Sequence, residues 1–186
     1  MIKAAFCDDD LSVLNELHVL MDNYRVERNQ EITYTAFHSP LELIAQIEKG
    51  MRFDILFLDV LMPGVNGIET AQEIREYDSA MKIIFLTSSA EYAVESYTVN
   101  AYFYQLKPIW PESFYRLMDS VLKECAQEQR RSLILRCKSG ITQISLDRLM
   151  YCEVQGRILV FHMQNGEQLE SVGSMDDLSG QLAKYN

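Results

Sequence analysis

Residues 53 to 67 read Phe53-Asp-Ile-Leu-Phe-Leu-Asp-Val-Leu-Met-Pro-Gly-Val-Asn-Gly67, and this stretch decides the fold. Its apolar run is interrupted by Asp59, and a run of this length without alternation is typical of a strand buried on both faces of a parallel sheet. An ionised carboxylate in such a run is costly unless it lies at the strand's end or meets a cation. Turn residues follow at once, so we expect Asp59 at the carboxyl edge of an open α/β sheet, where ligands bind.

The amino terminus predicts a second acidic strand end. Ile2 to Cys7 reads as a short buried strand, and Asp8-Asp9-Asp10 follows it directly. Adjacent carboxylates raise one another's pKa unless a cation joins them, and Mg²⁺ prefers oxygen ligands from one or two carboxylates plus water. We therefore predict a Mg²⁺ site here, with Asp10 as the N-cap of the next helix. The alternative is that all three acids cap that helix and favour its dipole.

Periodicity and turn residues predict the remaining elements of the first 125 residues. The expected strands cover residues 32–37, 81–86 and 100–106 beside the two already described, and the expected helices cover residues 11–28, 40–49, 67–77, 111–129 and a segment from about residue 91.

Two polar residues follow the later strands. Thr87 ends one strand, so its hydroxyl is expected at the same carboxyl edge of the sheet as Asp59, where ligands bind. Lys107 follows the last strand, and its ammonium group could neutralise the acidic cluster. As an alternative, Thr87 is an ordinary strand-end residue and Ser89 an N-cap.

Residues 1–125 resemble the receiver domains of bacterial two-component response regulators, on the strength of the Asp59 segment, the paired acids, Thr87-Ser88 and Lys107-Pro108. The resemblance implies a flavodoxin-like, doubly wound five-stranded parallel sheet and phosphoryl transfer from a sensor histidine kinase. It also implies a cis peptide bond before Pro108. Asn100 departs from the glycine usual before the last strand, although Asn tolerates positive φ. The implied roles are phosphoacceptor for Asp59, switch residues for Thr87 and Tyr104, phosphoryl partner for Lys107, direct metal ligand for Asp9, water-mediated ligand for Asp8 and metal ligand through the backbone carbonyl for Leu61.

A second, smaller piece begins after a polar linker at residues 126–131. Short strands at residues 133–138, 141–145, 149–154 and 157–163, separated by turns at Gly140, Gly156 and Asn165-Gly166, predict a small β meander followed by a hairpin and a helix near 174–182. Residues 132–186 resemble the first half of a LytTR-type DNA-binding domain, apparently truncated. Arg157 lies in a turn that could enter a DNA groove, although an ordinary exposed turn residue is the favoured explanation.

Composition and charge exclude several classes of protein. Among 186 residues, 48% are hydrophobic and 24% charged, which is typical of a folded globular chain. Residues 1–125 carry 10 basic and 20 acidic residues and residues 126–186 carry 7 of each, so neither part has the basic charge of a nucleic-acid binder. The sequence has no apolar run of membrane-spanning length and no secretory signal, so we expect a cytoplasmic protein without membrane contact. The four cysteines lie far apart, without metal-ligand spacing.

Together these observations favour a phosphorylation-controlled switch, not an enzyme, with a transcriptional output by resemblance. We expect a homodimer on activation and, for this chain, weak DNA binding or none. One alternative is an aspartyl-phosphate hydrolase, which would need a second acid where Leu61 stands. Another is a regulator that acts only through protein contacts.

Overall fold

The computed structural model describes residues 1–137 and 140–183, with the side chains of residues 128–130 excepted. Lys138 and Ser139, placed by the sequence at the end of a strand and in a turn, lie outside these residues, as does Asn186. Contacts divide the chain into two compact units, Met1–Val121 and Leu122–Asn186. Each unit is described by itself.

The first unit is built on a five-stranded parallel sheet with the order β2-β1-β3-β6-β7. Every neighbouring pair is parallel, and the order reverses direction at β1, as in the flavodoxin-like arrangement. This confirms the fold class predicted for residues 1–125. The strands are β1 (Ile2–Cys7), β2 (Ile32–Phe37), β3 (Ile55–Asp59), β6 (Lys82–Thr87) and β7 (Phe103–Leu106).

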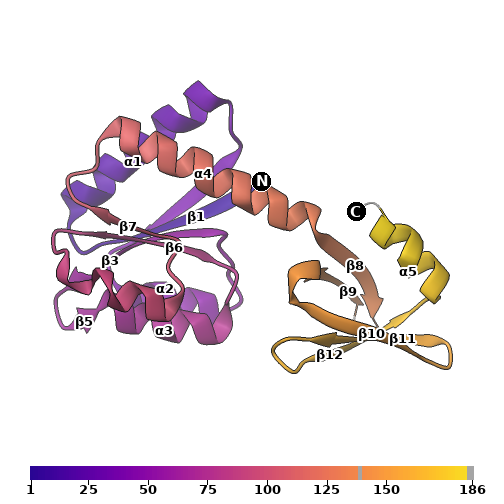
Figure 1. Cartoon of the computed structure of the whole chain (residues 1–186). Coiled ribbons are helices and arrows are strands. Elements are labelled where there is room, and N and C mark those ends of the chain that lie inside the picture. Colours follow the sequence, from indigo (N-terminus) through magenta and orange to yellow (C-terminus); the bar gives the residue numbers. More distant parts are fainter. Residues whose placement is uncertain (138–139, 184–186) are drawn as a thin grey trace. The chain divides into compact units, whose positions relative to one another are not determined.

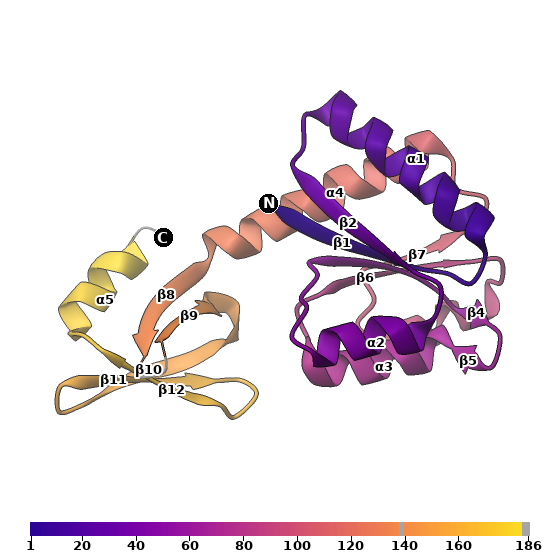
Figure 2. The same ribbon diagram turned by 180° about the vertical axis from the view of Figure 1, so that it is seen from behind.

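Helices cover both faces of this sheet (Figures 1 and 2), with α1 and α4 on one face and α2 and α3 on the other. They are α1 (Leu11–Arg28), α2 (Pro40–Glu48), α3 (Gly67–Tyr77) and α4 (Pro111–Arg130). Asp10 is the N-cap of α1, as predicted, and Ser39 and Asn66 are the N-caps of α2 and α3; the side chain of each accepts a hydrogen bond from the backbone N–H two residues later.

The two faces of the sheet bury different side chains. On one face, the ring centroid of Phe57 lies 5.5 Å from that of Phe6 and 5.6 Å from that of Phe114. These contacts join β1 and β3 to α4. On the other face Leu56, Leu58 and Phe85 pack with the buried residues of α2 and α3. The central strands are therefore apolar on both sides, which explains the unbroken run of residues 55–58.

The prediction of a helix from about Glu91 is wrong as to an α-helix. The segment forms two 3₁₀ helices, η1 (Glu91–Ala93) and η2 (Glu95–Val99). Here the side chains of Ser96 and Thr98 donate hydrogen bonds to backbone carbonyls three residues earlier, at distances of 2.7 Å, and such local bonds compete with regular α-helix geometry. Asn100, with φ of 50°, then ends the segment in the left-handed conformation.

The second unit is a five-stranded antiparallel sheet with the order β10-β11-β12-β8-β9. Its core includes Leu133, Ile144 and Phe161, with Leu178 from α5 packed against them. A small mostly-β piece is therefore confirmed. The elements are β8 (Ser132–Cys137), β9 (Gly140–Ser145), η3 (Leu146–Arg148), β10 (Leu149–Gln155), β11 (Ile158–Met163), β12 (Gln168–Val172) and α5 (Met175–Leu182).

Within the described residues, no helix has both the length and the apolar character needed to cross a membrane.

Candidate phosphoacceptor site

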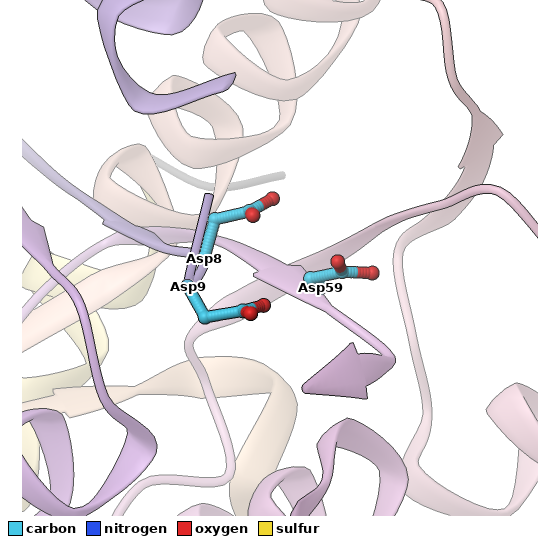
Figure 3. Close-up of side chains that lie close together, drawn as sticks. All are labelled: Asp8, Asp9 and Asp59. Atoms are coloured by element: carbon cyan, nitrogen blue, oxygen red, sulfur yellow. The ribbon is translucent and has the colours of Figure 1, made fainter. Parts of the chain in front are cut away.

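Three carboxylates meet at the carboxyl edge of the parallel sheet. Asp59 is the last residue of β3, and Asp8 and Asp9 follow β1, which pairs with β3 in a register that aligns Cys7 with Leu58. One oxygen from each of the three lies within 4.8 Å of the others, and Figure 3 shows the three side chains close together and extending to the same side from the two strand ends. Asp8 and Asp59 are buried and Asp9 is exposed, so the cluster opens to solvent on the Asp9 side.

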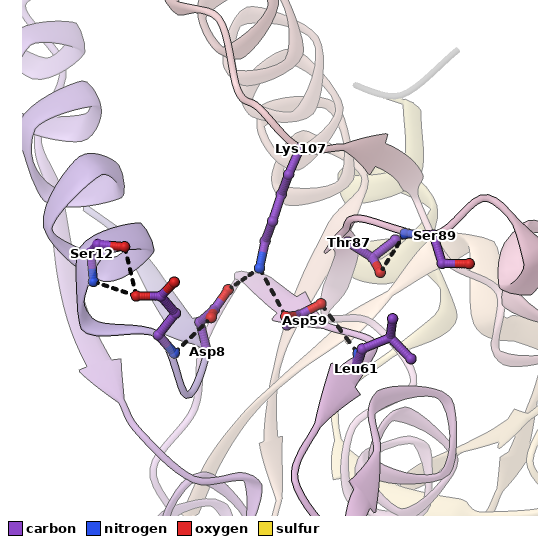
Figure 4. Close-up of polar contacts among 8 residues, drawn as sticks. Asp8, Ser12, Asp59, Leu61, Thr87, Ser89 and Lys107 are labelled. Carbon is purple, nitrogen blue, oxygen red and sulfur yellow. Dashed lines mark hydrogen bonds and ion pairs between the residues drawn. The ribbon is translucent and has the colours of Figure 1, made fainter.

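Lys107 joins the two buried acids. Its Nζ lies 2.7 Å from Asp8 Oδ2 and 2.8 Å from Asp59 Oδ2 (Figure 4). Burial alone would lower the pKa of Lys107, but the hydrogen bonds to Asp59 and Asp8 outweigh it and raise the pKa above its usual value. The ammonium group is therefore held positive. Its backbone N–H donates to the carbonyl of Thr87 at 2.9 Å, and the following peptide bond to Pro108 is cis, as expected.

Burial dominates the acid–base behaviour of the neighbours on β1. It raises the pKa of Asp8, and the hydrogen bond from Lys107 opposes that shift only in part. Burial, together with the charges of Asp8 and Asp59, also raises the pKa of Cys7 to about 12. The thiol next to the cluster therefore stays protonated at neutral pH and is a poor nucleophile.

The backbone after Asp59 forms a hydrogen bond to the second carboxylate oxygen of Asp59. The N–H of Leu61 donates to Asp59 Oδ1 at 3.2 Å. The turn predicted here contains a short hairpin of β4 (Leu61–Met62) and β5 (Val65–Asn66). A Cβ on Gly67 would lie 2.1 Å from the carbonyl oxygen of Asp59, so α3 can begin this close to β3 only with glycine. The sequence identified Gly67 as a turn former, whereas its role is this close approach.

The two expected switch residues lie on neighbouring strands. Thr87 is fully buried at the end of β6, and its Oγ1 accepts a hydrogen bond from the Ser89 N–H at 3.3 Å. Tyr104, half-buried on β7, donates from its hydroxyl to the Ser89 carbonyl at 2.6 Å. Thr87 and Tyr104 therefore both hold the start of the β6–β7 connection. Sequence reasoning assigned Ser89 only as a cap, because a backbone acceptor leaves no mark on the sequence.

The donor set fits Mg²⁺. Oxygen ligands about 2.1 Å from one ion lie at most about 4.2 Å apart, which is close to the observed spread of the three carboxylates. Asp8, Asp9 and Asp59 are hard oxygen donors, and the exposed side at Asp9 leaves room for the water that Mg²⁺ retains. Lys107 neutralises part of the cluster's charge and lies between the two buried acids.

Arg157, the candidate DNA contact, belongs to the second unit. It is exposed and follows Gly156, which has φ of 66°, in the turn between β10 and β11. Toward the other end of the β10–β11 pair, His162 stacks on Tyr151 with ring centroids 4.2 Å apart, and His162 Nε2 lies 3.0 Å from Glu153 Oε1.

Comparison with known protein families agrees with this geometry. The response regulator receiver domain matches residues 5–119. The chain is 28% identical over 139 residues to the sensory transduction protein LytT of Oceanobacillus iheyensis, covering 71% of this chain and 56% of LytT. It is 24% identical to the transcriptional regulatory protein NatR of Bacillus subtilis, covering 98% of this chain and 76% of NatR. For the accessory gene regulator protein A of Staphylococcus epidermidis the identity is 28%, covering 96% of this chain and 80% of that protein.

Solved structures give the same fold. The response regulatory domain of mrkE from Klebsiella pneumoniae superposes with a TM-score of 0.60 at 23% identity, covering 68% of this chain and 99% of that domain. The chemotaxis protein CheY4 of Vibrio cholerae gives a TM-score of 0.56 at 25% identity, covering 65% of this chain and 98% of CheY4.

Proposed function

Since the chain belongs to the response regulator receiver family, we propose that it is a switch of a two-component system that accepts a phosphoryl group on Asp59 from a sensor histidine kinase. The observation that carries this proposal is the convergence on Asp59 of a lysine and two further acids at one sheet edge. We assign the receiver role to residues 1–125, a connection at 126–131 and the LytTR-type piece to residues 132–186.

For phosphoryl transfer, the protein needs mainly to position the reacting groups and to stabilise their charge. A carboxylate oxygen of Asp59 attacks the phosphorus of a phosphohistidine, the P–O bond forms as the P–N bond breaks, and the leaving imidazole keeps the electron pair and takes a proton from water. Lys107, 2.8 Å from Asp59, pairs with the incoming phosphoryl oxygens as a fixed positive charge. The Leu61 N–H orients the other carboxylate oxygen.

Mg²⁺ is the cofactor we assign. Asp9 and Asp59 would bind it directly, Asp8 through water and Leu61 through its backbone carbonyl. Bound Mg²⁺ supplies charge neutralisation at the phosphoryl oxygens. Asp8 and Asp9 are held in place for this because the end of β1 directly before them, Ala4 to Cys7, is paired with β3.

The signal leaves the site through Thr87 and Tyr104. A phosphoryl oxygen on Asp59 offers the Thr87 hydroxyl a new acceptor, and Thr87 Oγ1 then gives up its bond to the Ser89 N–H. Because Tyr104 holds the carbonyl of the same Ser89, movement of this residue releases the tyrosine. The two side chains therefore act as one switch.

We infer a transcriptional output because the relatives named above are transcriptional and sensory regulators. For this chain, pairing with a second copy is favoured over DNA as the immediate partner, since the basic residues of residues 126–186, Arg157 among them, are balanced by an equal number of acids. A cytoplasmic location follows from the need to meet the kinase. The hydrolase alternative has no support, because Leu61, where a second acid would be needed, has no titratable group.

The test is to incubate the full chain with acetyl phosphate and Mg²⁺ and to map the adduct by mass spectrometry. We expect one phosphoryl group on Asp59 and none on the Asp59→Asn chain, with Asp54→Asn as the matched control at the other end of the same strand segment. Equal labelling of Asp59→Asn would overturn the proposal.

A further inference from the structure

The guanidinium group of Arg75, in the last turn of α3, donates hydrogen bonds to four backbone carbonyls. Nε donates to Val99 at 2.8 Å, and Nη2 donates to Asn100 at 3.2 Å. Nη1 donates to Asp78 at 3.0 Å and to Met81 at 2.8 Å. The acceptors come from two separate segments, the connection between α3 and β6 and the end of η2. Arg75 therefore ties the end of η2 to α3.

Three of these carbonyls, those of Asp78, Val99 and Asn100, need a donor because two helices end here, and the fourth, that of Met81, lies just before β6. The helix α3 ends at Tyr77 and η2 ends at Val99, and the last carbonyls of any helix lack partners within it. A planar guanidinium carries five N–H donors in a fixed fork and can serve several such acceptors at once. A lysine in its place would offer three donors from a single atom and could not reproduce the fork.

The segment from Ser89 to Asn100 is therefore held at both ends by different means. At its start, beside Asp59, the Ser89 carbonyl accepts one hydrogen bond from the Tyr104 hydroxyl. At its end, Val99 is buried and its carbonyl is bound to Arg75. Between these points Ser96 is 4% exposed and Tyr92 packs against the core, whereas Val94 and Tyr97 are 77% and 82% exposed, so packing restrains the middle of the segment only in part.

We propose that Arg75 is a positioning residue: it is the fixed pivot about which residues 89–95 move when Asp59 is modified. This rests on the proposed function of Asp59. Charge-assisted hydrogen bonds are stronger than neutral ones, so the four bonds from the Arg75 guanidinium outlast the two neutral bonds that Tyr104 and Thr87 make with Ser89. Asn100, with φ of 50°, supplies the sharp bend at the pivot itself. Movement is thereby confined to the end of the segment that adjoins Thr87 and Ser89.

Amide hydrogen exchange of the full chain, detected by mass spectrometry, tests the pivot. The exchange is run in Mg²⁺, with and without beryllofluoride, which stands in for the phosphoryl group. The amides of Asn100 and Ala101 report on it, since they donate to Tyr97 and Ser96 within the segment. In the wild-type chain we expect beryllofluoride to speed exchange in residues 89–95 and to leave Asn100 and Ala101 unchanged.

Arg75→Met keeps the length and the apolar stem of the side chain but removes the donors. We expect exchange at Asn100 and Ala101 to become about tenfold faster or more before any beryllofluoride is added, while β1 amides stay protected. In the Arg75→Lys chain, exchange at Asn100 and Ala101 should be faster than in wild type but slower than in Arg75→Met, because one ammonium group reaches fewer carbonyls. The control is Arg116→Met, which changes an exposed arginine that bonds the Glu112 carbonyl on its own helix.

Equal exchange at Asn100 and Ala101 in the Arg75→Met and Arg116→Met chains would overturn the pivot, as would faster exchange throughout β1. A wild-type response to beryllofluoride as large at Ala101 as in residues 89–95 would overturn it as well. Failure of the proposed function has a different signature, namely no wild-type response at residues 89–95 at all.

Discussion

Each unit of this chain contains an acid–base pair at nearly the same distance, in opposite surroundings. Lys107 Nζ lies 2.8 Å from Asp59 in the first unit, and His162 Nε2 lies 3.0 Å from Glu153 in the second. The Asp59 side chain is 8% exposed, whereas that of Glu153 is 46% exposed. Distance alone therefore says little about what a pair does. Burial gives the first pair its strength and its chemical use, and solvent screens the second.

Surroundings also decide what each pair can become. The Asp59 pair is joined by Asp8 and Asp9, so excess negative charge is gathered where a cation or a phosphoryl group can bind. Around Glu153 the neighbours are Gln155, whose Nε2 lies 3.0 Å from the same carboxylate oxygen, and the ring of Tyr151 stacked on His162. The Glu153 carboxylate therefore already has its hydrogen-bond partners. This set of side chains is suited to stabilising a sheet surface.

The largest effect is expected from breaking the buried pair. Lys107→Met leaves Asp8 and Asp59 without their cation, and removing one partner of a largely buried pair costs about 3 kcal/mol, or about 2 kcal/mol after allowance for the partial exposure of Lys107. Urea unfolding without metal, followed through the single tryptophan, Trp110, measures this in the first unit. Lys123→Met, at an exposed site, is the control and should cost under about 0.5 kcal/mol.

The pH dependence of this effect has a definite sign. The pKa of Lys107 is raised in the folded chain by its bonds to Asp59 and Asp8, which outweigh the opposite effect of burial. Its stabilising contribution is therefore complete below the unfolded value of about 10.5 and is lost as the pH rises through the folded value. On the alkaline side, the gap in unfolding free energy between wild type and Lys107→Met should narrow only above that pH. A gap that closes near pH 7 would contradict the ion pair.

A smaller effect is expected at the exposed member of the acidic cluster. Asp9→Ala should weaken Mg²⁺ binding about tenfold or more, since it removes one of the few direct ligands that Mg²⁺ takes from protein. The fold should stay intact, because the substitution also removes like-charge repulsion beside Asp8. Calorimetric titration measures the affinity, and Asp10→Asn, which keeps the helix cap, is the control. Unchanged Mg²⁺ affinity would reject Asp9 as a ligand.

The sequence predicted some features of the fold and the site and missed others, for physical reasons. The parallel sheet and its acidic edge were predictable because an apolar run ending in Asp59 has few other physical explanations. The 3₁₀ character of residues 91–99 was not, since it depends on local competition by Ser96 and Thr98. The carbonyls bound by Arg75 and Tyr104 were also beyond reach, because main-chain acceptors are the same for every residue type. The assigned roles of Asp9, Leu61 and Thr87 remain predictions.

A still smaller effect is expected at the exposed pair. The hydrogen bond from His162 lowers the pKa of Glu153, so its contribution is present above the unfolded value of 4.5 and is lost as the pH falls through the folded value. At pH 7, Glu153→Gln should speed amide exchange in β10 and β11 by less than about threefold, and the difference should fade below pH 4.5. In 1 M salt, where the Debye length is about 3 Å, it should largely vanish. A difference that survives this salt would mean that the pair is not screened.

The smallest effect is expected from Arg157, at the candidate DNA contact. Phosphate contacts dominate DNA affinity and each needs a cation, but residues 126–186 balance seven basic residues with seven acids. One base contact is worth about 1 to 3 kcal/mol, too little for specific binding by itself. At about 0.15 M salt, where the Debye length is about 8 Å, mobility-shift assays should detect weak binding or none, and Arg157→Gln should change it less than about twofold. The matched control is Arg148→Gln, on the other side of β10 from the turn. Sub-micromolar, sequence-selective binding that Arg157→Gln abolishes would show that the second unit, despite its neutral charge, is a DNA reader in its own right.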